Sequence, residues 1–272
     1  MTKEDYDVEI VDHWECPAET GVALLTMPNV PRALHGLPPR VIMGRTAWDF
    51  VRKACYANAG YKCEICGEDF ADIKPRYAAH ELYSYDYAKQ EGVFERCVAI
   101  CAKSHDFIHS GRLITMYKNG NPMYPREYVL EVVEKGFKLI HDYNESHPDQ
   151  EPLRAYATFL EYLETDLHDE MVTLIDKYGM KFYKEHIKKN KLWKGWHLIY
   201  GNKRHESPYS SQKEWEEAMQ KANEKDLVRQ VKNPFQGEVY DEWDKILKSD
   251  IETKLAGCKD GRISKRKEND ND

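Results

Sequence analysis

The residues with the most evident chemistry are cysteines and histidines between positions 63 and 109. Cys63 and Cys66 form a C-x2-C motif that ends in a glycine, and such a knuckle directs two thiolates toward one point. Cys101 follows, and His105 and His109 come after it at intervals of four residues. Two ligands from a knuckle and two from the start of a helix make the closed tetrahedral set of a structural zinc. The pattern therefore predicts a structural Zn²⁺ site.

The fourth ligand of this site is less directly fixed by the spacing. On a helix, Cys101, His105 and His109 lie four residues apart and face the same side. The two ends of this stripe are about 12 Å apart at a rise of 1.5 Å per residue, and zinc ligands lie about 2.0–2.3 Å from the ion. Either Cys101 and His105 join the knuckle, or His105 and His109 do. We favour Cys63, Cys66, Cys101 and His105 as the zinc ligands.

A His-Glu pair, His80 and Glu81, lies between the two halves of this constellation. The metalloprotease motif H-E-x-x-H fails, because position 84 is serine. A zinc deaminase would place H-x-E before its C-x-x-C pair, which is the reverse of the order here. Both of these enzyme classes are therefore excluded.

The order of motifs over about residues 46–112 resembles the HNH (ββα-metal, treble-clef zinc) endonuclease superfamily, in particular a phage and bacterial subgroup. The matching positions are Trp48, Val51 and Arg52, then Cys63, Cys66 and Gly67, then His80, Glu81, Tyr83, Tyr85 and Asp86, and finally Cys101, His105, His109 and Gly111. The resemblance implies a metal-dependent endonuclease that hydrolyses phosphodiester bonds in DNA. It also implies His80 as the general base, and His109, helped by His105, as the holder of a catalytic Mg²⁺ or Mn²⁺. Glu81 or Asp86 would orient an imidazole or supply an oxygen ligand.

Three positions depart from the subgroup's pattern. Ser104 stands where the second cysteine of the helix is expected, Ala79 replaces the Asp that often precedes the base, and no Asn lies between His80 and His105. The alternative is a catalytically degenerate zinc-binding module that binds nucleic acid or a protein partner without cleavage. A weaker alternative is a phage-type protein that acts on a host partner through its C-terminal helices.

Charge is distributed unevenly along the chain. The net charge is −7, but residues 142–170 carry −8 and residues 181–204 carry +7. Local charge governs attraction to nucleic acid, so the total excludes little. Lysines neutralise phosphates and aromatic rings stack on bases, so we predict nucleic-acid-binding residues in the basic stretch: Lys184, Lys188, Lys189, Lys191, Trp193, Lys194 and Trp196. The alternative is that these aromatic side chains belong to the core.

Periodicity and breaker residues predict an α+β fold, with a central zinc-stapled ββα domain and a mainly helical C-terminal domain. The expected division is an irregular leader over 1–45, the HNH-like domain over 46–118, a helical domain over 119–256 and a disordered, charged tail over 257–272. Helices are predicted from about 46 to 59, 101 to 110, 125 to 143 and 153 to 178, and a further one begins at Ser211 with Glu214 as its box partner. The apolar stripe of the 153–178 segment is expected to pack in the core.

Composition excludes a membrane protein, because no stretch approaches the roughly 20 apolar residues that cross a bilayer. The acidic N-terminus lacks the apolar region of a secretory signal. We therefore expect an intracellular, cytoplasmic protein with reduced cysteines, with DNA as its partner. If it is phage-encoded, it would act in the host cytoplasm.

Overall fold

The computed structural model describes residues 1–70 and 77–221. It contains one compact unit, Met1–Trp215, and assigns Glu216–Asp272 to a second one; the description below concerns the first. Within the described residues, no helix has both the length and the apolar character needed to cross a membrane. The predicted tail over 257–272 and the region from 222 to 256 lie outside the described residues.

The fold mixes helices and strands, as the sequence predicts. The strands are β1 (Val8–Val11), β2 (His13–Trp14), β3 (Tyr77–Asp86), β4 (Glu91–Cys101), β5 (Ala155–Tyr156), β6 (Phe182–Glu185), β7 (His197–Tyr200) and β8 (Lys203–Glu206). The α-helices are α1 (Pro39–Ile42), α2 (Arg45–Asn58), α3 (Ala102–Ile108), α4 (Ser110–Lys118), α5 (Arg126–Ser146) and α6 (His168–Tyr178). Short 3₁₀ helices are η1 (Lys3–Asp5), η2 (Val22–Thr26), η3 (Arg32–Leu34), η4 (Ala157–Glu164) and η5 (Lys189–Lys191).

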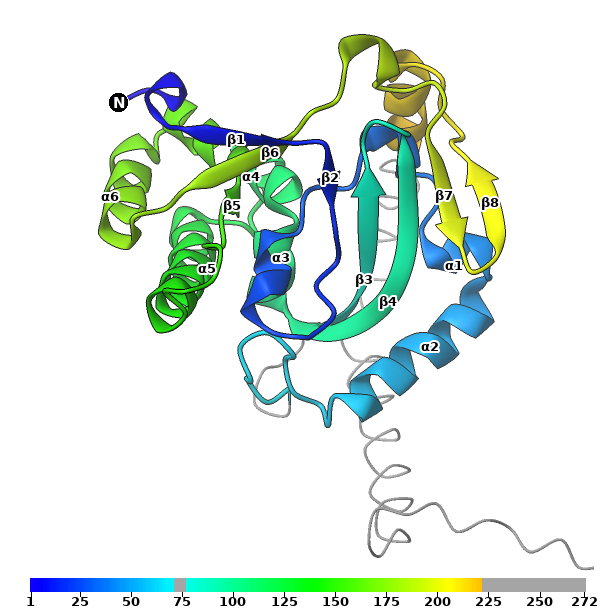
Figure 1. The fold of residues 1–272 in the computed structure, drawn as a ribbon, viewed down its shortest axis with the longest axis horizontal. Helices are drawn as coiled ribbons and strands as arrows, with labels where there is room; N and C mark the ends of the chain where they lie inside the picture. The colour runs from blue at the N-terminus through cyan, green and yellow to red at the C-terminus, as the bar shows by residue number, and fades with distance from the viewer. Residues whose placement is uncertain (71–76, 222–272) are drawn as a thin grey trace, which may run out of the picture. The chain divides into compact units, whose positions relative to one another are not determined.

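The strands form two sheets (Figure 1). A three-stranded parallel sheet has the order β1-β6-β5, and a five-stranded mixed sheet has the order β2-β3-β4-β7-β8. The long β3–β4 hairpin dominates the larger sheet, and its register pairs Tyr77 with Cys101 and His80 with Val98. Because α3 begins at the residue after β4 ends, the hairpin and the helix form a continuous ββα unit.

The hairpin lies between helices on its two faces. On one face α2 packs against β3 and β4, and the Tyr56 hydroxyl accepts a hydrogen bond of 3.1 Å from the backbone N–H of Ala79. On the other face lies α3, which in turn packs against α5. Adjacent residues of a strand point to opposite faces, so neighbouring positions of β3 face different helices.

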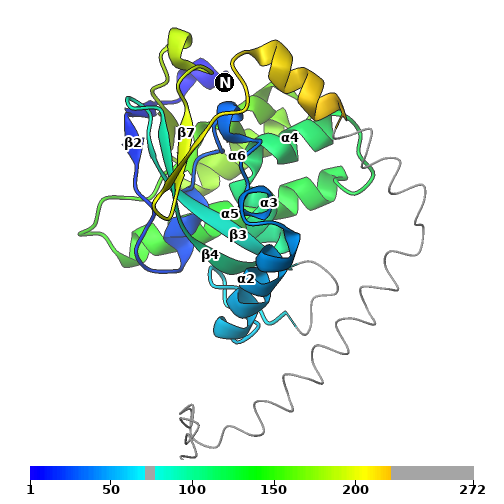
Figure 2. The same ribbon diagram turned by 90° about the vertical axis from the view of Figure 1, so that its right-hand side faces the viewer.

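Helix α5 is the largest buried element of the core, and α4 runs beside it (Figure 2). Its buried face includes Gly136, where a Cβ atom would lie 2.1 Å from the ring of Phe107 on α3. The Phe107 ring also contacts Phe159, with ring centroids 4.5 Å apart. The absence of a side chain at Gly136 therefore lets α3 approach α5 closely and fixes the helix that follows β4.

The leader over 1–45 is more regular than the sequence indicates. Strand β1 pairs in parallel with β6, and β2 pairs antiparallel with β3, so this segment contributes to both sheets. Leu24, Leu25 and Met27 lie in the core. Residues 1–45 thus belong to the same compact unit as the hairpin. Local sequence patterns could not predict this, because the pairing partner of β1 lies some 170 residues away in the sequence.

The segment from 153 to 178 is broken rather than one helix. It forms β5, then η4, then α6, which begins after Thr165. The apolar stripe is nevertheless buried, as predicted, over Tyr156, Leu160, Leu163, Leu167, Met171, Leu174 and Tyr178. The cap at Ser211 is also confirmed, since its hydroxyl accepts a hydrogen bond of 3.3 Å from the backbone N–H of Glu214.

Candidate metal centres

The knuckle at Cys63 and Cys66 is fixed by its own backbone and by strand β4. The Cys63 carbonyl accepts a hydrogen bond of 2.8 Å from the N–H of Gly67, whose φ of 75° suits a residue without a side chain. Glu64 then docks on Ala99 of β4 twice: its N–H donates to the Ala99 carbonyl at 2.9 Å, and its carboxylate accepts from the Ala99 N–H at 2.6 Å. These bonds hold the two thiols against the end of the hairpin.

The third thiol comes from Cys101, the last residue of β4. The ligand atoms of Cys63, Cys66 and Cys101 all lie within 4.8 Å of one another, and the sulfurs of Cys66 and Cys101 are 3.8 Å apart. Hydrogen bonding from the Cys101 and Cys66 side chains holds the pKa of the Cys63 thiol well below its usual range. Three convergent sulfurs of which one is readily ionised form a donor set suited to a soft metal ion such as zinc.

A second group consists of three histidines on the inner face of the hairpin. His80 extends from β3, His105 from α3, and His109 from the residue that ends α3. The ring centroids are 5.3 Å apart for His80 and His105, 4.9 Å for His80 and His109, and 4.5 Å for His105 and His109. One nitrogen from each ring lies within 4.8 Å of the others. The three imidazoles therefore converge on one small volume.

Burial keeps these three imidazoles neutral. It lowers the pKa of His80 well below its ordinary value, that of His105 to about 4 and that of His109 to about 3. His80 is 1% exposed, and among the described residues neither of its ring nitrogens has a hydrogen-bond partner. A buried polar group without a partner is costly, and neutral imidazole is the form that binds metals. The group therefore fits a metal ion that would complete the bonding of His80.

Charged residues flank the histidine group on one side. The Arg112 guanidinium lowers the pKa of both His105 and His109 by repulsion, after the larger effect of burial. It is held by the buried carboxylate of Asp106 at 3.2 Å, and the Tyr128 hydroxyl donates to the same carboxylate at 2.6 Å. The Arg112 side chain is 48% exposed. An anchored cation thus lies at the surface next to the buried imidazoles.

The structure divides the predicted ligands between two groups. His105, predicted as the fourth zinc ligand, lies instead with His80 and His109, and the polar neighbour of the three thiols is Ser104. The reason is helical geometry, since consecutive residues of a helix point about 100° apart. Glu81, predicted to assist His80, pairs with Cys97 and faces α1 and α2, where Arg40 influences its charge. It therefore lies on the opposite face of β3 from the imidazoles.

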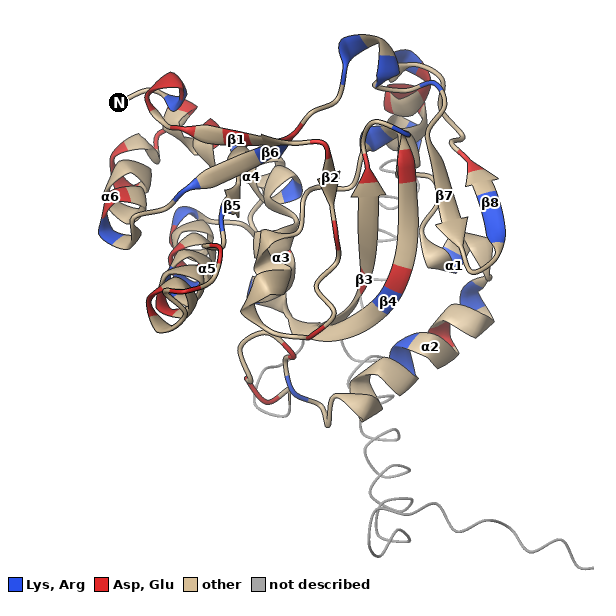
Figure 3. Cartoon of the chain, in the orientation of Figure 1, with Lys and Arg blue, Asp and Glu red and all other residues tan. Residues whose placement is uncertain are grey.

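The basic stretch from Met180 to Arg204 does not form one face. It forms β6, η5 and β7, and η5 carries clustered positive charge (Figure 3). Trp196 is fully buried and its indole N–H donates to the Lys191 carbonyl at 2.9 Å, so it serves as a core residue rather than a stacking platform. Trp193 is half-buried against the ring of Trp215. The exposed lysines of the predicted set are Lys184, Lys188, Lys189 and Lys194.

Three residues near the two groups escape the sequence analysis: Asp106, Arg112 and Lys135. The first two flank the histidines in the sequence, so their proximity to His105 and His109 was a usable signal. Lys135 lies 34 residues after Cys101, and its ammonium is 4.0 Å from the Cys101 sulfur. Only the packing of α5 on α3 brings it there.

Comparison of the chain with models of protein families, with characterised proteins and with solved structures gave no match. What the structure establishes is a mixed α+β fold with a Cys₃ group and a His₃ group, each able to hold a metal ion such as zinc.

Proposed function

We propose that the protein is a metal-dependent endonuclease of the HNH type, which hydrolyses phosphodiester bonds in DNA. The observation that carries the proposal is the convergence of three neutral imidazoles, one buried and two partly buried, on the inner face of a ββα unit. The adjacent thiol group supports it, because a zinc at that place would staple the knuckle to the junction of β4 and α3 and so fix the imidazoles.

All three histidines act as ligands in this proposal, which changes the role of His80. The resemblance implies that His80 is a general base, but its side chain is 1% exposed and its nearest polar neighbours include the His105 and His109 rings. A base must reach the proton that it removes. A bound cation would supply stabilisation of charge on the phosphate and would lower the pKa of a bound water. His80, His105 and His109 hold and orient that cation.

The donor set favours a transition metal over magnesium. Mg²⁺ prefers oxygen ligands and keeps several waters, whereas imidazole suits metals later in the first row. With no carboxylate in the His80, His105 and His109 group among the described residues, we expect Mn²⁺, Co²⁺, Ni²⁺ or Zn²⁺ to support activity better than Mg²⁺ does.

Arg112 is the proposed contact for the phosphate. Its guanidinium is anchored by Asp106, is half exposed and lies close enough to His105 and His109 to influence their protonation. Arg presents a planar fork of donors that matches phosphate oxygens. It would therefore hold the scissile phosphate beside the imidazoles.

The test is nicking of supercoiled plasmid by the full-length protein in Mn²⁺, Co²⁺, Ni²⁺ or Mg²⁺, with EDTA added afterwards. We expect cation-dependent nicking that EDTA stops and that His109→Ala abolishes. His13→Ala is the matched control, because His13 lies exposed on β2 outside both groups. Absence of nicking with every cation, or full nicking by His109→Ala, would reject the nuclease.

The second candidate is a module that binds nucleic acid or a protein without cutting. The burial of His80 and the position of Glu81 on the other face of β3 favour it, because they leave no protein base at the imidazoles within the described residues. Salt-dependent DNA binding without nicking would support this candidate.

A further inference from the structure

The thiol group has a fourth polar neighbour, Ser104. Its hydroxyl oxygen lies 3.3 Å from the Cys101 sulfur and 3.8 Å from the Cys63 sulfur, and the side chain is buried. A tetrahedral zinc with bonds of about 2.3 Å to sulfur and about 2.0 Å to oxygen separates two sulfurs by about 3.8 Å and a sulfur from an oxygen by about 3.5 Å. The Cys66–Cys101, Cys101–Ser104 and Cys63–Ser104 distances lie close to these edges of a tetrahedron with Ser104 at one corner.

Local geometry explains why Ser104 occupies this corner. Cys101 is the N-cap of α3, so Ser104 is the third residue of the helix, the position whose side chain reaches back toward the cap. The contact between Gly136 and Phe107 then fixes α3 on α5. The next residue, His105, points to the other group.

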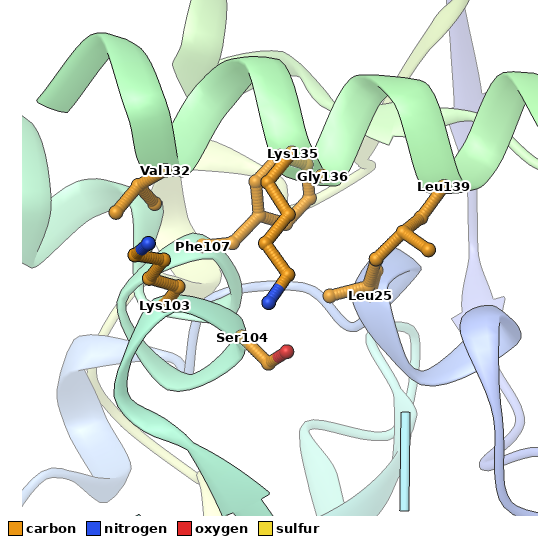
Figure 4. A pocket seen from close by; sticks show the side chains of 8 residues that line it. All are labelled: Leu25, Lys103, Ser104, Phe107, Val132, Lys135, Gly136 and Leu139. Atoms are coloured by element: carbon orange, nitrogen blue, oxygen red, sulfur yellow. The ribbon is translucent and has the colours of Figure 1, made fainter. Parts of the chain in front are cut away.

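Lys135 supplies a counter-charge beside the same corner. Figure 4 shows its side chain extending from α5 toward Ser104, and the ammonium lies 4.0 Å from the Cys101 sulfur. Its other partner is the carboxylate of Glu68, which forms an ion pair with it at the end of the knuckle. Three thiolates and one divalent cation carry a net charge of −1, whereas four thiolates would leave −2. The Lys135 ammonium, which also pairs with Glu68, offsets part of the smaller charge.

We propose that Cys63, Cys66, Cys101 and Ser104 form a Cys₃Ser zinc site in which the Ser104 hydroxyl oxygen is the fourth ligand. Lys135 is the positioning residue whose ammonium lies beside the Cys101 thiolate. The site closes around the ion with one weak oxygen ligand, and His105 is left for the histidine group. This inference depends only on the thiol group and is independent of whether the protein cleaves DNA.

The experiment replaces zinc with Co²⁺ in the full-length protein under anaerobic conditions. Only the thiol site gives thiolate-to-cobalt charge-transfer absorbance, so cobalt held by imidazoles does not interfere. The wild type should show three-thiolate intensity, and Ser104→Cys should raise it by about one third. Ser104→Ala should shift the visible cobalt bands and weaken cobalt binding about 10-fold or more, while Ser104→Thr, which keeps the hydroxyl, should restore both.

Two further variants complete the test. His105→Ala should leave the thiolate-to-cobalt charge-transfer absorbance unchanged, and Lys135→Met should weaken cobalt binding at the thiol group more than Lys138→Met, which changes an exposed lysine of the same helix. The proposal is overturned if Ser104→Ala keeps the wild-type charge-transfer bands and affinity, if Ser104→Cys fails to increase the charge-transfer intensity, or if His105→Ala changes the charge-transfer absorbance.

Discussion

The cysteine group and the histidine group both lie on the ββα unit, yet they differ in charge and in what surrounds them. The first joins the knuckle to the end of β4, and the second joins β3 to α3. The sulfurs lie at the knuckle, where a lysine and a glutamate form an ion pair beside them. The imidazoles are neutral; that of His80 is buried, those of His105 and His109 are partly buried, and both nitrogens of His80 lack a protein partner within the described part of the chain. Among the described residues, the exposed Arg112 lies at the edge of this second group.

This contrast indicates two different tasks. A thiolate set with its own counter-charge and a fourth oxygen is closed, which is the property of a structural metal site. A set of three neutral imidazoles leaves a fourth position, which is the property of a catalytic one. Substitutions at each group separate the two tasks.

Loss of one thiol should affect stability most. Cys101→Ala removes a ligand at the junction of β4 and α3, and folding free energy is coupled to metal binding at such a site. We expect loss of the bound zinc and a fall of about 10 °C or more in the melting temperature. The control is Cys55→Ala, which changes a half-buried thiol outside both groups. Equal melting curves for the two variants would contradict a structural zinc.

Acid should destabilise the protein through the imidazoles. Above pH 6.5 these histidines are neutral in both the folded and the unfolded chain, so they contribute no pH dependence there. Below pH 6.5 the histidines of the unfolded chain bind protons. In the folded chain, His105 binds its proton only near pH 4 and His109 only near pH 3. The free energy of unfolding should therefore fall with falling pH, by about 1.4 kcal/mol per pH unit for each proton.

Urea unfolding between pH 7 and 4.5 measures this effect. His109→Asn should make the slope shallower by about one proton, whereas His13→Asn should keep the wild-type slope. A wild-type slope in His109→Asn would mean that the imidazole does not titrate as its burial requires.

A substitution at Gly136 tests the close packing of α3 on α5. Gly136→Ala places a Cβ atom 2.1 Å from the Phe107 ring, and the resulting overpacking should lower stability by about 1–3 kcal/mol. Because α3 carries Ser104 and His105, metal affinity at both groups should fall as well. Lys138→Ala, on the exposed side of the same helix, should cost less than about 0.5 kcal/mol. Unchanged metal affinity at both groups would show that metal binding does not depend on how closely α3 packs on α5.

Arg112→Ala should separate phosphate binding from metal binding. We expect plasmid nicking to fall about 10- to 100-fold, because the variant lacks a charge-assisted hydrogen bond to the phosphate worth roughly 1.5–3 kcal/mol. The number of bound metal ions should stay the same. Arg204→Ala, an exposed arginine on β8, is the control. If the variant loses bound metal together with activity, the role of Arg112 is to position the imidazoles and not to bind the phosphate.

The exposed lysines near η5 should give the smallest effect. If they neutralise phosphates, the combined change of Lys184, Lys188 and Lys189 to Ala should reduce the salt slope of DNA binding by about 0.9 for each phosphate left without its lysine. Lys138 and Lys177, already paired with carboxylates, provide the control changes. An unchanged slope would remove this region from the DNA interface.

Much of this arrangement follows from local patterns in the sequence. The knuckle, the strand before Cys101 and the helix after it are all local, so the convergence of Cys63, Cys66 and Cys101 could be predicted from spacing. The division between His105 and Ser104 could not. It depends on which way α3 turns when it packs on α5, and that is set by the contact of Gly136 with Phe107, 29 residues apart in the sequence.

The basic stretch and the leader likewise depend on strand pairings between segments far apart in the sequence, which local patterns do not predict. Trp196 looks like a stacking residue beside lysines, but the parallel pairing of β7 with β4 carries it into the core. The pairing of β1 with β6 is likewise non-local. Amphipathic pattern predicted burial correctly in the 153–178 segment, while it could not predict the interruption near Thr165.

The most direct test of the account counts metal ions per chain in the full-length protein and in His109→Ala after both are equilibrated with Zn²⁺ and freed of excess. We predict two ions per chain in the wild type and one in the variant, with the folded state preserved. One ion per chain in both proteins would contradict a metal centre on the imidazoles, and with it the proposed nuclease.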